Sequence, residues 1–161
     1  MRDEIPRQLT MDVIQDFEDI LELFARHSVR YLIVGGLAFI YHAKPRYTKD
    51  IDLWIDRDHN NVLRANRALE EFGSPMLMTI DDPEEILQLG VAPNRIDILR
   101  ETIALGFDET WPRRIESHYG RAPANWIDLD SLLAIKSAID HPRHQEDARV
   151  LRAVRDRRKP D

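Results

Sequence analysis

The sequence predicts an α/β (α+β) fold in which a small mixed, mainly antiparallel sheet is flanked by helices, with further helices at the C-terminal end. Three observations carry this prediction. Short strand-like segments alternate with segments of helical periodicity. The chain of 161 residues is long enough to bury one core without cross-links. The expected order is helix, strand, helix, strand, helix, strand, strand and then helices, which favours a sheet covered by helices on one side.

The first helix and the first strand are the clearest local predictions. The helix is expected to begin after Thr10, a candidate N-cap, because apolar residues follow it at helical spacing. These residues are Met11, Val13, Ile14, Phe17, Ile20, Leu21 and Phe24. Residues 31–34 then form an apolar run typical of a short buried strand. Gly35-Gly36 ends this run and opens a helix that continues to about His42.

Two later segments alternate between apolar and polar residues, as strands with two different faces do. In residues 49–55, one face carries Ile51, Leu53 and Ile55, and the other carries Asp50, Asp52 and Trp54. In residues 95–99, Ile96 and Ile98 point one way and Asp97 points the other. Both segments are therefore predicted strands with acidic residues on one face. Trp54 shares that face, where it would either stack on a base or pack against neighbouring side chains.

The remaining segments follow from the same rules. Residues 60–72 are predicted as a helix that Gly73 stops, residues 76–80 as a strand, residues 109–117 as a short helix, and residues 129–139 and 143–157 as the last helices. We expect residues 1–125 to form the main core. Residues 126–161 are expected to form a C-terminal helical segment that packs on the same domain.

Composition excludes several classes of protein. The chain has no cysteine, which rules out disulfides and thiolate metal sites. Its longest apolar stretch, LIVGGLAFIY, is too short to span a bilayer, and its N-terminus lacks the apolar region of a signal peptide, so we expect a cytoplasmic protein with no membrane partner. The formal net charge of −6 argues against a generic nucleic-acid coat. The arginine-rich end, ARVLRAVRDRRKPD, is either a solvated helix end or a tail that binds RNA or another acceptor.

Three aspartates are candidates for a metal site. Asp50 and Asp52 lie at positions i and i+2 of a predicted strand, so their carboxylates leave the same face about 7 Å apart along the chain. Asp97 would supply a third oxygen ligand from the second alternating strand. Three carboxylates without soft ligands suit Mg²⁺ or Mn²⁺. The alternatives are a solvent-facing strand edge for the Asp-x-Asp pair, and Asp81-Asp82 in place of the third carboxylate.

Gly35-Gly36 is a candidate phosphate site. Paired glycines between a strand and a helix are commonly just a tight turn. The functional alternative is that a turn without side chains lets backbone N–H groups at the helix start approach phosphate oxygens. The spacing fits neither the dinucleotide-binding glycine motif nor the P-loop.

The combined segment VGGLAFIYHAKPRYTKDIDLWID resembles the signature of the nucleotidyltransferase superfamily, which has the polymerase-β-like fold. The part RYTKDIDL is similar to the form found in bacterial minimal nucleotidyltransferases of toxin–antitoxin and abortive-infection systems. A looser resemblance covers LDSLLAIKSAIDHPRHQEDARVL, where Lys136 lies on a helix and Arg143 and Asp147 take the place of a basic–acidic pair. His144-Gln145-Glu146 departs there from the usual Lys-Asp.

The resemblance implies a mechanism and a role for each site residue. Gly35 and Gly36 would hold the triphosphate of a nucleoside triphosphate, and residues 1–125 would form the catalytic core. Asp50, Asp52 and Asp97 would bind divalent cations and carry catalysis, with Mg²⁺ or Mn²⁺ as the cofactor. The further nucleotide-binding residues would be Arg46, Thr48, Lys136 and Arg143. The reaction would transfer a nucleoside monophosphate to an acceptor hydroxyl and release pyrophosphate.

The acceptor stays open at this point. An acceptor RNA or tRNA, or a partner protein such as a cognate toxin or antitoxin, would fit a bacterial toxin–antitoxin-like system. An antibiotic of the aminoglycoside or lincosamide kind is the alternative, since those resistance enzymes share the pattern of two glycines followed by Asp-x-Asp. A member that binds a nucleotide or a partner without catalysis is a further alternative, which the three intact aspartates disfavour.

Overall fold

The computed structural model describes residues 13–158 and contains one mixed sheet with helices around it. The expected N-cap Thr10 lies outside the described residues. In chain order the elements are α2 (Gln15–Arg26), β1 (Tyr31–Val34), α3 (Gly35–His42), β2 (Asp50–Ile55), α4 (His59–Phe72), β3 (Leu87–Leu89), β4 (Arg95–Leu99), α5 (Phe107–Thr110), η2 (Trp111–Arg113), β5 (Ile115–Tyr119), β6 (Ala122–Trp126), α6 (Leu129–Ala138) and α7 (Pro142–Arg158).

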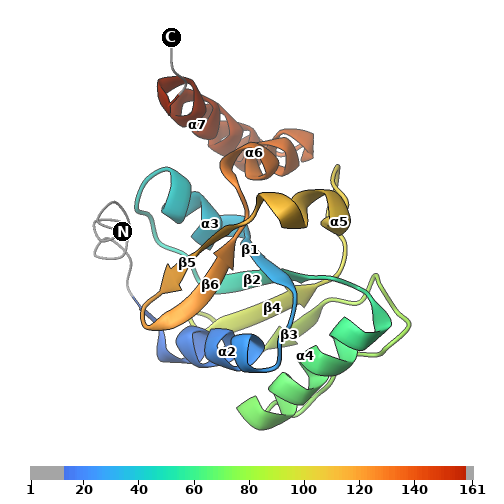
Figure 1. Ribbon diagram of the computed structural model, residues 1–161. Coiled ribbons are helices and arrows are strands. Elements are labelled where there is room, and N and C mark those ends of the chain that lie inside the picture. The colour runs from blue at the N-terminus through green and yellow to red at the C-terminus, as the bar shows by residue number, and fades with distance from the viewer. Residues whose placement is uncertain (1–12, 159–161) are drawn as a thin grey trace.

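The six strands are arranged in the order β3-β4-β2-β1-β6-β5 (Figure 1). Three neighbouring pairs are antiparallel, namely β1 with β2, β3 with β4, and β5 with β6. The pairs β2 with β4 and β1 with β6 are parallel. The prediction of a mixed, mainly antiparallel sheet flanked by helices is therefore confirmed. The two acidic strands, β2 and β4, lie side by side near one end of this order.

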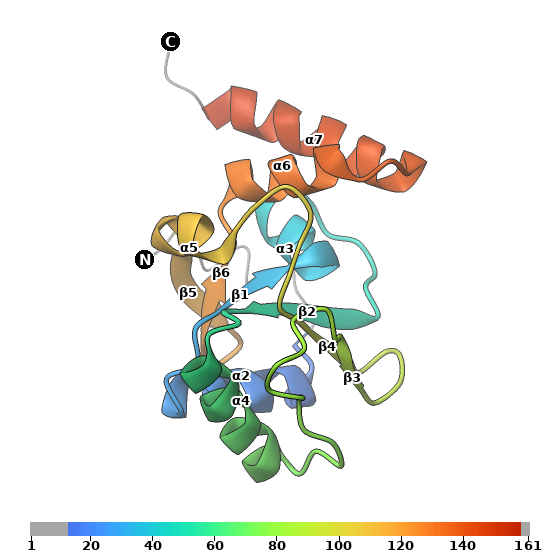
Figure 2. The same cartoon turned by 90° about the vertical axis from the view of Figure 1, so that its right-hand side faces the viewer.

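Helices cover both faces of the sheet, not one as the element order suggested. Helices α2 and α4 lie against one face, and α3 lies against the other with α6 and α7 stacked outside it (Figures 1 and 2). The pattern of β2 explains this arrangement, since Ile51, Leu53 and Ile55 are fully buried on one face and Trp54 is 1% exposed on the other. A strand that is apolar on both faces needs cover on both.

The predicted strand over residues 76–80 is wrong. These residues form a loop after α4. The side-chain amide of Asn66 replaces a neighbouring strand there, because it accepts a hydrogen bond from the backbone N–H of Met78 at 2.9 Å and donates one to its carbonyl at 3.0 Å. The strand beside β4 is instead β3, a three-residue segment that the sequence did not single out.

The predicted helix over residues 109–117 is also wrong. A single helical turn, α5, continues into the short 3₁₀ helix η2, and the chain then forms a hairpin of β5 and β6. The turn residue Gly120 has a φ of +58°, which suits glycine. Buried residues alternate along both strands of the hairpin, namely Ser117, Tyr119, Ala122, Ala124 and Trp126. Pro123 concealed this alternation, since proline within a run argues against a strand.

The segments that position the acidic residues agree with the sequence prediction. Strands β1 and β4 and helix α3 have the expected bounds, and β2 begins one residue later than expected. Helices α6 and α7 contact each other and α3. None of the helices in the described range is both long and apolar enough to cross a membrane.

Candidate metal and nucleotide site

The pairing of β2 with β4 brings the three predicted aspartates together. The two strands are parallel, and Asp52 lies opposite Asp97 in their register. Carboxylate oxygens of Asp50, Asp52 and Asp97 lie within 4.8 Å of one another. Within the described residues, this is the group of acidic or histidine side chains whose geometry suits a metal ion. An all-oxygen set of this size fits Mg²⁺ or Mn²⁺.

The glycine turn lies directly against this cluster. Gly35 has a φ of +70°, and a Cβ atom placed on it would lie 2.0 Å from Oδ2 of Asp52. A Cβ atom on Gly36 would lie 3.0 Å from the hydroxyl oxygen of Thr48. Close approach and backbone conformation both require glycine at position 35, whereas a Cβ atom at position 36 would press on the Thr48 side chain. The turn, Thr48 and the carboxylates form one continuous site.

Helix α3 starts at this turn and offers backbone donors to an anion. Its N-cap, Val34, makes no side-chain capping hydrogen bond, and its first turn contains no acidic residue. The first N–H groups of a helix have no partner within the helix, and the helix dipole favours negative charge at that end. A phosphate beside Gly35 and Gly36 would satisfy these donors.

The carboxylates destabilise one another's ionised forms. Burial, together with the charges of Asp50 and Asp97, raises the pKa of Asp52 to about 7. Burial and the charge of Asp97 also raise the pKa of Asp50, while the Arg95 guanidinium opposes the rise. A bound divalent cation would favour the ionised forms of all three groups.

Arg95 is a site residue that the sequence reasoning missed. Its Nη2 lies 2.7 Å from Oδ2 of Asp50 and 3.1 Å from Oδ2 of Asp97, and its Nε lies 3.0 Å from Oδ1 of Asp97. Arg95 is opposite Asp50 in the register of β2 and β4. The available signal was the spacing Arg95-x-Asp97, which puts a cation on the acidic face of β4.

Two predicted nucleotide-binding residues contact a common acid. Arg46 donates to both carboxylate oxygens of Asp147, at 2.7 and 3.0 Å, and the Nζ of Lys136 lies 3.0 Å from Oδ2 of Asp147. Burial alone would raise the pKa of Asp147, but the hydrogen bonds from Arg46 and Lys136 hold it below its usual value. This cluster joins the loop before β2 to α6 and α7. Either cation would have to leave Asp147 to reach a phosphate.

The other two predicted nucleotide-binding residues lie at the glycine turn, for Thr48, and at the start of α7, for Arg143. The hydroxyl of Thr48 donates to the backbone carbonyl of Asp50 at 3.4 Å and lies over Gly36. Arg143 is exposed in the first turn of α7, and its positive charge is a minor influence against the raised pKa of Asp50.

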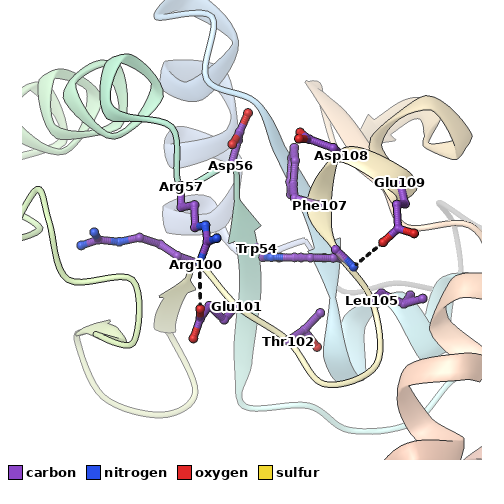
Figure 3. Close-up of a pocket in the computed structure, with 11 residues that line it drawn as sticks. Trp54, Asp56, Arg57, Arg100, Glu101, Thr102, Leu105, Phe107, Asp108 and Glu109 are labelled. Carbon is purple, nitrogen blue, oxygen red and sulfur yellow. Dashed lines mark hydrogen bonds and ion pairs between the residues drawn. The ribbon is translucent and has the colours of Figure 1, made fainter.

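A cavity of about 540 Å³ lies further along the same face of β2. Trp54, two residues after Asp52, lines this cavity together with Leu105 and Phe107 from the chain after β4 (Figure 3). The Trp54 ring packs edge-on against Phe107 at 5.3 Å between centroids, which confirms a packing role for this tryptophan. The charged lining residues are Asp56, Arg57, Arg100, Glu101, Asp108 and Glu109. Acidic groups thus outnumber basic ones around the cavity.

Comparisons with known proteins bear on the fold. No protein-family model matches the chain, and no curated protein sequence does. Among solved structures, the lincosamide antibiotic adenylyltransferase LnuA, crystallised with lincomycin bound, is similar with a TM-score of 0.59 and 19% identity over 89% of this chain and 99% of that chain. ANT(2'')-Ia, crystallised with adenylyl-2''-tobramycin, is similar with a TM-score of 0.54 and 16% identity over 89% of this chain and 97% of that chain.

These similarities extend over almost the whole length of both solved proteins, at low sequence identity. At this identity the similarity concerns the arrangement of the helices and strands. The chain therefore has the fold of the antibiotic nucleotidyltransferases.

Proposed function

We propose that this protein is a metal-dependent nucleotidyltransferase that moves a nucleoside monophosphate from a nucleoside triphosphate to an acceptor hydroxyl. The observation that carries the proposal is the contact between the glycine turn and the carboxylate cluster, where Asp52 lies over Gly35 and opposite Asp97. A triphosphate on the turn would have its phosphates beside three carboxylates that suit Mg²⁺ or Mn²⁺. The fold supports the same chemistry.

Each side chain has a defined part in this proposal. Asp50, Asp52 and Asp97 hold the divalent cation, which would neutralise phosphate charge and favour the ionised acceptor hydroxyl. Gly35 and Gly36 let backbone N–H groups bind the phosphate tail. The acceptor oxygen forms a bond to the α-phosphorus while the bond to pyrophosphate breaks, and the hydroxyl proton passes to Asp97 or to water.

Three cationic side chains and one hydroxyl complete the nucleotide-binding site in this proposal. Thr48 and Arg143 are proposed to bind the phosphates, which is supported by the closeness of Thr48 to Gly36 and by the effect of the Arg143 charge on Asp50. Arg46 and Lys136 are proposed to bind phosphate after exchange of their Asp147 partner. Nucleoside triphosphates are cytoplasmic substrates, which agrees with the proposed cytoplasmic location.

The cavity beside Trp54 favours a small hydroxylated acceptor. Its volume of about 540 Å³ matches a small-molecule site, and it lies on the face of β2 that carries Asp50 and Asp52. Its acidic lining would repel a triphosphate and attract a cationic molecule. The acceptors bound or modified in the two similar structures, lincomycin and tobramycin, are the first compounds to test.

A macromolecular acceptor in a toxin–antitoxin-like system is the second candidate. Helix α7 supports it, because its last turn carries Arg155, Arg157 and Arg158. A basic helix end suits an RNA or tRNA backbone. A partner protein, such as a cognate toxin or antitoxin, would use the same exposed helix.

The test is transfer of label from α-labelled ATP, CTP, GTP and UTP with Mg²⁺, in separate reactions with lincomycin, tobramycin, total RNA and cell lysate. Label in a small molecule supports the first candidate, and label in RNA or in one protein supports the second. Asp50→Asn and Asp52→Asn should abolish transfer. The absence of transfer to every acceptor, with both variants indistinguishable from the unaltered protein, would contradict the proposed enzyme activity.

A further inference from the structure

Arg95 contacts the carboxylate oxygens that a divalent cation would need. Its guanidinium spans two of the three candidate ligands, with contacts of 2.7 Å to Asp50 and of 3.0 and 3.1 Å to Asp97. The three carboxylates and the guanidinium together leave a formal charge of −2. A guanidinium and a divalent cation would compete for the same lone pairs on Asp50 and Asp97.

The surroundings of Arg95 allow the guanidinium to leave. Its side chain is 35% exposed, and that of Asp50 is 22% exposed, so water reaches this ion pair. Ion pairs that water reaches contribute little to stability, because their Coulomb attraction is screened. By contrast, the ion pair between Lys136 and Asp147 has both side chains 4% exposed. The ion pairs of Arg95 are therefore easier to exchange than the buried pair of Lys136 with Asp147.

We propose that Arg95 is a displaceable counter-cation that moves from the carboxylates to the phosphates of the nucleotide when a divalent cation binds. This inference rests on the proposed function. The phosphate tail would lie between the glycine turn and β4, since Asp52 contacts Gly35 on one side and is opposite Asp97 on the other. The planar guanidinium of an arginine can donate two hydrogen bonds to two oxygens of one phosphate, so a phosphate can replace the carboxylates as its partner.

The exchange couples the two ligands. A divalent cation that binds without a nucleotide must displace Arg95 and leave its charge without a partner. A nucleotide supplies the new partner, so each ligand strengthens the binding of the other by the same factor. Arg95 is thus a positioning residue for the nucleotide and a restraint on binding of the cation alone.

Titration with Mn²⁺ in the absence of nucleotide tests the competition, with free Mn²⁺ measured by electron paramagnetic resonance. Arg95→Met is expected to bind Mn²⁺ about tenfold more tightly than the unaltered protein, which corresponds to about 1.4 kcal/mol. Arg26→Met is the matched control, because Arg26 forms an exposed ion pair with Glu71 between α2 and α4. This control should leave the affinity for Mn²⁺ unchanged.

Calorimetric titration with a non-hydrolysable ATP analogue at saturating Mn²⁺ tests whether Arg95 moves to the phosphates of the nucleotide. Arg95→Met is expected to bind the analogue about tenfold more weakly than the unaltered protein. Arg95→Lys keeps the charge and loses the planar guanidinium. Its affinities for Mn²⁺ and for the analogue should therefore lie between those of the unaltered protein and of Arg95→Met. Circular dichroism establishes that each variant is folded before it is titrated.

The outcomes separate this inference from the proposed function. An affinity for Mn²⁺ that is unchanged or lower in Arg95→Met overturns the competition. A tighter affinity for Mn²⁺ with an unchanged affinity for the analogue overturns the move to phosphate. If the unaltered protein and Asp52→Asn bind Mn²⁺ equally, the proposed metal site itself fails, whatever Arg95→Met does.

Discussion

Single atoms decide the geometry of the site, and Gly35 is the clearest case. A methyl group at this position would lie 2.0 Å from a carboxylate oxygen of Asp52, in a backbone conformation that non-glycine residues rarely adopt. Asp52 can keep its position over the turn only because Gly35 has no side chain. The glycine therefore shapes the candidate metal site as well as the turn.

Gly35→Ala should weaken Mn²⁺ binding by at least about tenfold, because the methyl group displaces the Asp52 carboxylate from the cluster. Gly73→Ala is the matched control, since Gly73 has a φ of +93° with no atom within 4 Å of an added Cβ. This control should lower stability by about 1 kcal/mol and leave Mn²⁺ binding intact. Equal losses of Mn²⁺ affinity in both variants would mean that backbone strain, and not the contact, is responsible.

The raised pKa of Asp52 makes stability depend on pH. An unfolded chain releases this proton near pH 4, whereas the folded protein keeps it to about pH 7, so Asp52 lowers stability progressively as the pH rises between these values. With EDTA present at pH 8, Asp52→Asn should be more stable to urea by on the order of 2–4 kcal/mol. At pH 4 the two proteins should unfold at similar urea concentrations. A difference that is the same at both pH values would contradict the raised pKa.

Binding of the cation needs the ionised form of Asp52, and this gives the opposite trend for the ligand. The affinity for Mn²⁺ should fall as the pH is lowered through about 7, because protons and the cation compete for the same carboxylate. Titration with Mn²⁺ between pH 5.5 and 8 measures this trend. An affinity that is constant over this range would contradict competition between a proton and the cation at Asp52.

Among the elements, α6, α7 and the loop before β2 are joined by one buried cluster. Asp147 of α7 binds Lys136 of α6 and Arg46 of the loop, and Lys136 is 3% exposed. The loop leads directly to Thr48 and Asp50. The two C-terminal helices therefore help to hold the segment that enters the metal site.

Lys136→Met should lower the free energy of unfolding by about 3 kcal/mol, because it removes one partner of a buried ion pair. Arg26→Met, which breaks an exposed ion pair, should cost less than about 1 kcal/mol. Urea unfolding of both variants measures the difference. Equal stabilities would mean that the Lys136–Asp147 pair does not join these elements.

The elements that carry the site could be predicted from sequence, and several others could not. Strands β2 and β4 have an alternation that is visible locally, and the two glycines mark the start of α3. The three-residue strand β3 is short and depends on its neighbour β4 for pairing. The hairpin of β5 and β6 contains Pro123, which argues against a strand, and β6 also pairs with β1, which is distant in the sequence.

The same limit applies to the site. The three aspartates were predictable because their residue type and spacing suggest oxygen ligands. The role of Arg95 was not, because it depends on the register that puts Arg95 opposite Asp50, and register between distant strands is not visible in either strand alone. Lys136 and Arg46 were predicted beside phosphate, and the structure shows that they share Asp147.

In the whole molecule, the glycine turn lies beside the carboxylate cluster, and the acidic cavity lies further along β2 at Trp54. The turn suits an anionic donor, and the cavity beside Trp54 suits a neutral or cationic acceptor. Asp108 is exposed at this cavity, and in the described part of the chain it forms no ion pair. The proposed donor would therefore bind at the turn and the proposed acceptor at the cavity.

Asp108→Asn should raise the KM for a cationic acceptor by about two- to fivefold, the effect of one exposed charge, without changing nucleotide affinity. Glu22→Gln, on the opposite face of the sheet in α2, is the control and should change neither quantity. Initial rates at varied acceptor concentration measure the effect. A change in nucleotide affinity without a change in the KM for the acceptor would reverse the assignment of the cavity.

The central claim is that Asp50, Asp52 and Asp97 bind a divalent cation together with a nucleoside triphosphate. Calorimetric titration of the protein with each nucleoside triphosphate, with and without Mg²⁺, tests this claim without knowledge of the acceptor. We expect at least one nucleotide to bind the unaltered protein only when Mg²⁺ is present, and Asp52→Asn to lose this binding. Binding of equal strength to both proteins, or no binding of any nucleotide with Mg²⁺ present, would contradict the claim.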